Sequence, residues 1–157
     1  MKEVSGRSHT RVERPLEDCF ALLEALEEYP RWVGEYVRRV EVCKRDAHGR
    51  PRRAVATVHV EQSPFGKDFE LVLSVLPRFP RMIRQRRVGH DDRLELVWQF
   101  EPSEGGTSIA LEFVACVSFL PSLVPMGDAG NAIAEAALDA VADALTESPG
   151  RLATQET

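Results

Sequence analysis

The sequence contains little cysteine and no long apolar run, and each shortage excludes a class of protein. Its three cysteines, Cys19, Cys43 and Cys116, are odd in number and far apart, which fits neither a disulfide framework nor a paired zinc knuckle. We expect buried thiols. No apolar run approaches the length of a bilayer-spanning helix, and residues 1–7 lack the apolar stretch of a secretory signal. These features predict a cytoplasmic protein without a transmembrane segment.

Several catalytic and nucleotide-binding motifs are also missing. The sequence has no Gly-x-Ser-x-Gly elbow, no glycine-rich phosphate loop and no dinucleotide fingerprint, which argues against hydrolases, kinases and dehydrogenases. No two of the four histidines have the spacing of metal ligands. The sequence therefore predicts neither a metal site nor an organic cofactor.

Positive charge is not concentrated on one element. Residues 1–93 carry 19 of the 20 basic side chains, whereas residues 94–157 carry one basic and ten acidic side chains. The basic residues are scattered over several segments, so we expect no nucleic-acid partner. A length of 157 residues with 43% hydrophobic residues is typical of one globular domain. We place this domain at residues 1–147 and a flexible C-terminal tail at residues 148–157.

The first 36 residues combine one strand with two helices. Residues 4–12 alternate between small or apolar and charged or polar side chains, the period of a half-buried strand with a small, partly polar inward face. Pro15 suits the first turn of a helix that we expect to end near Glu27. Pro30 disfavours helical geometry in the residue before it, which predicts a kinked second helix over residues 28–36.

Six further strands and a long helix follow. Each strand alternates apolar and polar residues and is bounded by a turn or loop. The strands are expected at residues 37–46, 53–62, 69–75, 82–88, 94–100 and 107–117. After Pro125 the period changes to that of a helix over residues 127–146, which Pro149-Gly150 ends. This helix is wide on its apolar side, which predicts deep packing.

This order of elements predicts an α+β fold in which a seven-stranded curved antiparallel sheet wraps around the long C-terminal helix. Four features over residues 2–145 are the most telling: Pro15 with the Phe20 helix, Tyr29-Pro30-Arg31-Trp32, the Trp98–Pro102 strand with Gly105-Gly106-Thr107, and the last helix. On these features the chain resembles the START-like, or SRPBCC, superfamily of helix-grip proteins. The resemblance is to its polyketide cyclase/dehydrase-like or coenzyme Q-binding-like branch, and it implies a ligand cavity between sheet and helix.

The resemblance implies that apolar side chains around this cavity contact the ligand. We expect these to be Trp32, Tyr36, Phe69, Leu71, Leu73, Trp98, Phe100, Phe113, Met126, Ile133 and Ala137. Trp32 either lines the cavity or only packs the corner between the two short helices. Small side chains on the strands and the helix either leave room for a ligand or let helix and sheet approach closely. They are Ala54, Ala56, Ser74, Ala137 and either Ala140 or Ala144.

Four polar side chains are candidates for catalysis, each with a plainer interpretation beside it. Tyr36 lies where the resemblance implies the cavity mouth, so its hydroxyl would meet the polar end of a ligand. His59 and Glu112 either point to solvent, which strand alternation favours, or point inward and transfer protons. Arg84, with Arg86, either protects a strand edge or reaches inward to bind an anionic or enolate oxygen.

Three functions follow from these interpretations. The first is binding of a hydrophobic small molecule, such as a lipid, an isoprenoid or a polyketide, in the internal cavity. The second is a polyketide aromatase/cyclase, which would use the four candidates for aldol cyclisation and dehydration. The third is an interaction module or homodimer that associates through apolar residues of the loop 119–126.

Overall fold

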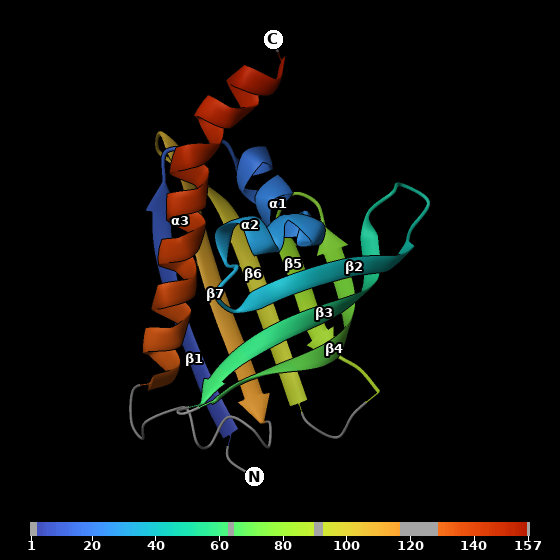
Figure 1. Cartoon of the computed structure of the whole chain (residues 1–157). Helices are drawn as coiled ribbons and strands as arrows, with labels where there is room; N and C mark the ends of the chain where they lie inside the picture. The colour runs from blue at the N-terminus through green and yellow to red at the C-terminus, as the bar shows by residue number, and fades with distance from the viewer. Residues whose placement is uncertain (1–2, 63–64, 90–92, 117–128, 157) are drawn as a thin grey trace.

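The computed structural model describes residues 3–62, 65–89, 93–116 and 129–156, and its strands form one antiparallel sheet (Figure 1). Neighbouring strands follow the order β1-β7-β6-β5-β4-β3-β2. The elements in chain order are β1 (Glu3–Val12), α1 (Leu16–Glu24), the 3₁₀ turn η1 (Leu26–Glu28), α2 (Tyr29–Trp32), β2 (Val37–Arg45), β3 (Pro51–Gln62), β4 (Phe65–Arg78), β5 (Met82–Arg87), β6 (Arg93–Ser103), β7 (Gly106–Cys116) and α3 (Ala129–Glu156). The predicted α+β helix-grip fold is confirmed.

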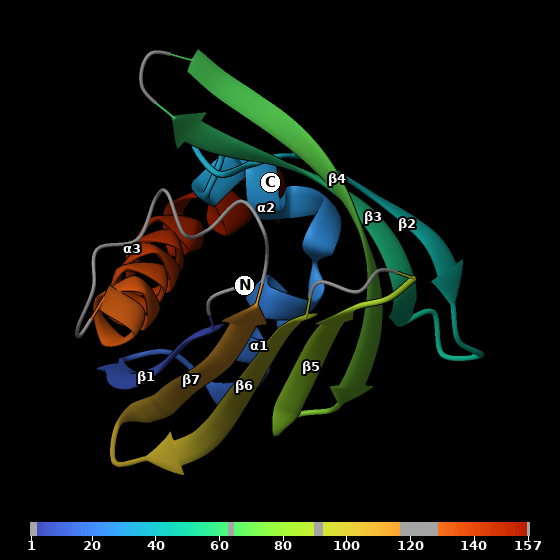
Figure 2. The ribbon, with the colours of Figure 1, turned by 90° about the horizontal axis from the view of Figure 1, so that it is seen from below.

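Alternation along the strands separates a concave, inward face from a convex, outward face. On β7, Ile109, Leu111 and Phe113 are buried, whereas Glu112 between them is exposed. The small inward face predicted for the first strand is also present, because burial on β1 alternates in the expected phase. Figure 2 shows the sheet bending around α1 and α3, which puts the concave faces of both halves towards the helices.

The start of α3 is held against the edge strand β1 by a contact between two backbones. A Cβ atom on Gly130 would lie 1.8 Å from the Ser5 carbonyl oxygen, and one on Gly6 would lie 2.1 Å from the Gly130 carbonyl oxygen. Glycine is therefore required on both sides of this crossing. The Arg7 backbone N–H also donates to Asn131 Oδ1 at 3.1 Å, so part of the strand edge is covered by α3.

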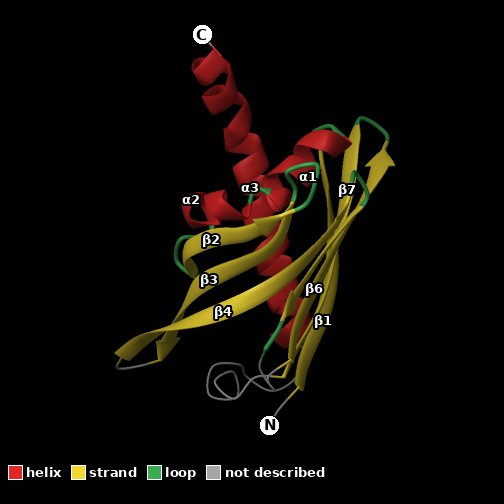
Figure 3. Cartoon of the chain, turned by 90° about the vertical axis from the view of Figure 1, so that its right-hand side faces the viewer, coloured by secondary structure: helices red, strands yellow, loops and turns green. Residues whose placement is uncertain are grey.

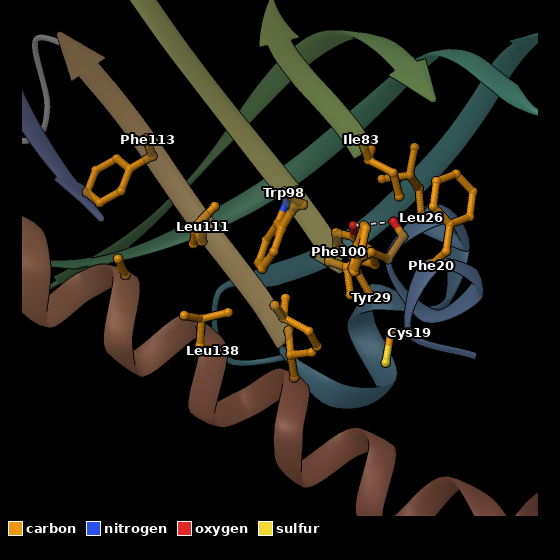
Figure 4. Packing of buried hydrophobic residues seen from close by; sticks show 14 of the residues in the cluster. Cys19, Phe20, Leu26, Tyr29, Ile83, Trp98, Phe100, Leu111, Phe113 and Leu138 are labelled. Atoms are coloured by element: carbon orange, nitrogen blue, oxygen red, sulfur yellow. Dashed lines mark hydrogen bonds between the residues drawn. The ribbon is translucent and has the colours of Figure 1, made fainter. Parts of the chain in front are cut away.

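Several of the most completely buried side chains lie where α1 and η1 meet the sheet (Figure 4). Phe20, Leu23 and Leu26 pack there in one cluster with Ile83 and Phe100, and all five side chains have almost no accessible surface. Burying a side chain of this size stabilises the fold by about 1.5–3 kcal/mol. This cluster closes one end of the space between sheet and helices.

The structure corrects several predicted boundaries. The second helix is a short turn over Tyr29–Trp32 rather than a helix over residues 28–36, and β4 continues to Arg78. The last helix does not end at Pro149-Gly150 but continues to Glu156. Figure 3 shows this part of α3 extending past the end of the sheet.

The expectation of buried thiols holds for one cysteine. Cys19 is completely buried in the core cluster, and this burial raises the pKa of its thiol. Cys116 is half-buried and Cys43 is exposed, because both lie on the outward-facing side of edge or near-edge strands. The prediction was wrong for Cys43, since alternation puts its neighbour Val42 inward instead.

Candidate functional site

The concave face of the sheet is lined mainly by apolar side chains. Six of the residues expected to contact a ligand face this interior, as their register positions and burial show. They are Phe69, Leu71 and Leu73 on β4, Trp98 and Phe100 on β6, and Phe113 on β7. Figure 4 shows Trp98 of β6 and Leu111 of β7 on the side of the sheet where Leu138 of α3 lies. The sheet and α3 therefore share one apolar interior.

Burial of the inward-facing side chains varies along the sheet. Next to α1, Ile83 and Phe100 are completely buried. Farther along the same strands and their neighbour, Leu73, Leu94 and Leu96 also face inward but are only half-buried. Side chains in a close-packed core lose nearly all of their accessible surface. The three leucines therefore keep part of their accessible surface on the concave face of the sheet.

The helix α3 turns one apolar stripe towards the sheet. Its buried stripe consists of Ala134, Leu138, Val141 and Leu145. Ala137, beside this stripe, is half-buried and packs against the hydrophobic core of the protein. Ile133 is 41% exposed, so its predicted place on the inward face is wrong. It lies about 100° around the helix from Ala134, on the side that turns away from the sheet.

A buried chain of hydrogen bonds joins the α1–α2 corner to the sheet. The Trp98 indole N–H donates to Gln85 Oε1 at 3.2 Å, and Gln85 Nε2 donates to the Tyr29 hydroxyl at 2.9 Å. That hydroxyl donates in turn to the Leu23 carbonyl oxygen at 2.5 Å. Burial raises the pKa of Tyr29 well above that of a free tyrosine, while the Gln85 hydrogen bond opposes the shift. The polar atoms satisfy one another, so the chain of hydrogen bonds fixes this corner.

The fifth strand turns a different arginine inward from the predicted one. The register pairs Arg87 with Leu73, and residues directly opposite in an antiparallel pair share a face. Arg84 and Arg86 are exposed on the convex face, where Arg84 Nε lies 3.5 Å from Glu95 Oε1. Of the two interpretations of Arg84, the inward one is therefore wrong, and edge protection does not apply either, because β5 lies between β4 and β6. The buried residue Ile83 sets the inward phase of β5, and that phase continues to Gln85 and Arg87, which were not among the predicted site residues.

Trp32 and Tyr36 line a groove of about 350 Å³ between the α2–β2 connection and α3. Its other lining residues are Arg31, Val33, Gly34, Glu35, Ala140, Asp143, Ala144 and Glu147. The Trp32 ring packs edge-on against Tyr29, with ring centres 5.0 Å apart. Its indole N–H is buried and has no acceptor among the described residues. Trp32 therefore both packs the helix corner and borders the groove, and Tyr36, 66% exposed, lies at its surface.

The remaining catalytic candidates lie on the convex face. His59 Nδ1 lies 2.6 Å from Asp68 Oδ1 on the neighbouring strand β4. Glu112 is exposed, in agreement with strand alternation. The sheet separates these two side chains and Arg84 from the interior, and Tyr36 lies apart from them in the groove. The four candidates therefore do not form one site.

Two further expectations concern small side chains and the loop before α3. Ser74 faces outward, because it pairs with Arg53 and Arg86. Its small side chain therefore does not enlarge the space inside the sheet. Ala54 and Ala56 do face inward and are buried. Met126 and the loop 119–126 lie outside the described residues, so the interaction-module function stays a prediction.

Two absences concern the described part of the chain. Within it, no three His, Cys, Asp or Glu side chains gather as metal ligands would. No helix in the same ranges combines the length and apolar character required to span a membrane.

A curved antiparallel sheet that wraps around a C-terminal helix and shares an apolar interior with it defines a helix-grip protein. The family described as polyketide cyclase / dehydrase and lipid transport matches residues 12–146. This match covers most of the chain, and the protein belongs to that family. No curated protein sequence matches it.

Solved structures share the fold at low sequence identity. A START superfamily protein from Mycobacterium smegmatis is 18% identical with a TM-score of 0.72, over 95% of this chain and 99% of that one. A Thermus thermophilus protein is 17% identical with a TM-score of 0.69, over 92% and 98% of the two chains. The di-domain aromatase/cyclase BexL of the BE-7585A biosynthetic pathway is 14% identical with a TM-score of 0.60. That match covers 90% of this chain but 49% of BexL.

Proposed function

We propose that this protein binds a hydrophobic small molecule, such as a lipid, an isoprenoid or a polyketide, between the concave face of the sheet and α3. The observation that carries the proposal is the incomplete burial of Leu73, Leu94 and Leu96, which face inward from adjoining strands. Water against such an apolar surface is unfavourable, and an apolar ligand would displace it. Each methylene group that a ligand buries there contributes about 0.8 kcal/mol.

Small residues around this surface support the same proposal. Ala56 on β3 and Ala137 on α3 face the interior, where larger side chains would fill the space next to the half-buried leucines. The buried cluster around Phe20 and Phe100 closes the α1 end. The ligand would therefore occupy the end of the interior away from α1. Lipid transport in the description of the family agrees with this proposal.

A pair of tryptophan substitutions on α3 tests where the ligand binds. Ala137 is half-buried beside the inward stripe, whereas Ala136 is exposed one position earlier. We expect Ala137→Trp to fill the binding space and to weaken binding of a neutral fluorescent probe, N-phenyl-1-naphthylamine, at least tenfold. Ala136→Trp adds the same side chain outside and should bind like the wild type.

Thermal unfolding of both variants shows whether they are folded, and native mass spectrometry of freshly purified protein shows whether a lipid-sized ligand co-purifies. Equal probe affinity for Ala137→Trp and wild type would place binding elsewhere. Absence of any probe binding by the wild type would contradict the proposal itself.

The alternative function is a polyketide cyclase. The name of the family and the shared fold of BexL support it, and Arg87 is a cation on the face where an enolate oxygen would need stabilisation. The dispersal of His59, Glu112 and Tyr36 argues against the predicted acid-base set. Incubation with a poly-β-ketone thioester tests this alternative, since a cyclase yields ring-closed product above the uncatalysed background. Recovery of unchanged substrate at the background rate would exclude it for that substrate.

A further inference from the structure

The interior carries positive charge and no negative charge on the described strands. Among the described inward-facing positions of β4–β7, the charged residues are Lys67 and Arg87. The acidic residues of these strands all lie at alternate, outward positions. They are Asp68, Glu70, Glu95, Glu101 and Glu112. The apolar surface proposed to bind a ligand is therefore electrostatically suited to an anion.

Arg87 lies beside the half-buried part of the interior. It is half-buried itself, it stands opposite Leu73, and it follows Arg86, whose partner Glu95 adjoins Leu94. A guanidinium beside apolar side chains loses some of its hydrogen bonds to water. A bound carboxylate or phosphate replaces them with two parallel hydrogen bonds. Arg87 also interacts with another group of the protein. Its five N–H donors allow it to bind a ligand oxygen in addition.

Lys67 supplies the second positive charge on this face. Its Nζ lies 5.1 Å from the centre of the Phe69 ring, two residues along β4 on the same side of the strand. Lys67 is exposed, whereas Phe69 is half-buried and leads towards Leu71 and Leu73. An exposed cation at the border of an apolar surface attracts anionic ligands and raises their rate of association.

We infer that the ligand is an amphiphile with one anionic head group, a carboxylate or a phosphate, which Arg87 binds while the apolar chain covers the leucines. This inference rests on the proposed function. The polar end of the ligand would then lie beside Arg87 of β5 and near Lys67 of β4.

Four ligands with the same twelve-carbon chain test the inference by isothermal titration calorimetry, below the micelle concentrations of the charged ligands and below the solubility limit of the neutral one. Dodecanoate and dodecyl phosphate are anionic, 1-dodecanol is neutral, and dodecyltrimethylammonium is cationic. The protein variants are Arg87→Gln and, as a matched control on the outward face of the same strand, Arg84→Gln. Thermal unfolding of each variant confirms that it is folded.

We expect the wild type to bind at least one anion about tenfold to a hundredfold more tightly than the alcohol, and the cation most weakly. Arg87→Gln should remove that preference and leave alcohol binding unchanged, whereas Arg84→Gln should behave like the wild type. The carboxylate and the phosphate arms distinguish the two head groups.

Equal wild-type affinity for all four ligands would overturn the anion inference while the proposed function stands. The inference would also be overturned if Arg87→Gln and Arg84→Gln lost the same affinity for the anions. The same holds if Arg87→Gln lost as much affinity for 1-dodecanol as for dodecanoate and dodecyl phosphate. A wild type that binds none of the four ligands would contradict both the inference and the proposed function.

Discussion

Gly130→Ala should destabilise the protein, although alanine is the better helix-forming residue. The methyl group that this substitution adds would lie 1.8 Å from the Ser5 carbonyl oxygen, and Cβ atoms in proteins essentially never come closer than 3.0 Å to another heavy atom. The contacting atom belongs to the backbone of β1, so it has no side-chain rotation by which to move away. Either the start of α3 or the edge strand must shift.

Two opposing effects set the size of the change. In a helix, alanine is favoured over glycine by about 1 kcal/mol. Overpacking of a close contact costs typically about 1–3 kcal/mol, and a clash between backbones belongs at the upper end of that range. The net loss of unfolding free energy should be about 2 kcal/mol, which lowers Tm by about 4–8 °C in a chain of this length. The hydrogen bond from the Arg7 N–H to Asn131 would weaken as the two backbones separate.

Equilibrium urea unfolding followed by circular dichroism measures the change. Ala132→Gly is the control, because Ala132 is exposed in the same turn and should lose only the propensity difference, up to about 1 kcal/mol. A Gly130→Ala variant as stable as the wild type, or more stable, would refute the close approach of α3 to β1. Helix propensity alone predicts that Gly130→Ala raises the unfolding free energy, whereas the backbone clash predicts that it lowers it. The sign of the measured change therefore separates the two effects.

Two further predictions concern the buried hydrogen-bond chain. Gln85→Leu should lower the unfolding free energy by about 1–3 kcal/mol, because it leaves the buried Trp98 indole N–H without its acceptor. Urea unfolding measures this loss, and Gln99→Leu on the outward face is the control. If Gln85→Leu lost no more unfolding free energy than Gln99→Leu, the prediction would be contradicted. Since burial raises the pKa of Tyr29, the unfolded chain ionises first, so stability should fall as pH rises above about 10. Tyr29→Phe should lack this part of the fall, and identical slopes for variant and wild type would show that Tyr29 does not cause it.

Much of the fold and part of the proposed binding surface are predictable from the alternation of apolar and polar residues along the strands. Phe69, Leu71 and Leu73 are read correctly as one face because side chains in a strand point alternately to its two sides. The outward positions of His59 and Glu112 follow from the same rule. The rule works where one face of the strand is clearly more apolar than the other.

It does not work where the two faces have similar composition. In β5, Met82 suggests one phase and Ile83 the other, so the strand alone does not decide which arginines face inward. Pairing with Leu73 decides it, because the neighbouring strand has a clear apolar face, and Arg87 then lies inside. The helix position Ile133 shows the same limit, since its exposure depends on which side of a largely apolar helix meets the sheet.

The sequence by itself determined the number of strands, their alternation and the long apolar helix, because these depend on local periodicity. Only the tertiary structure decided what depends on contacts between distant segments. The approach of Gly130 to Gly6, the Tyr29–Gln85 hydrogen bond and the inward position of Arg87 each join residues that are far apart in the chain or fixed by a neighbouring strand. The charge that we assign to ligand recognition belongs to this second group, since a strand residue acquires its surroundings only when the sheet forms.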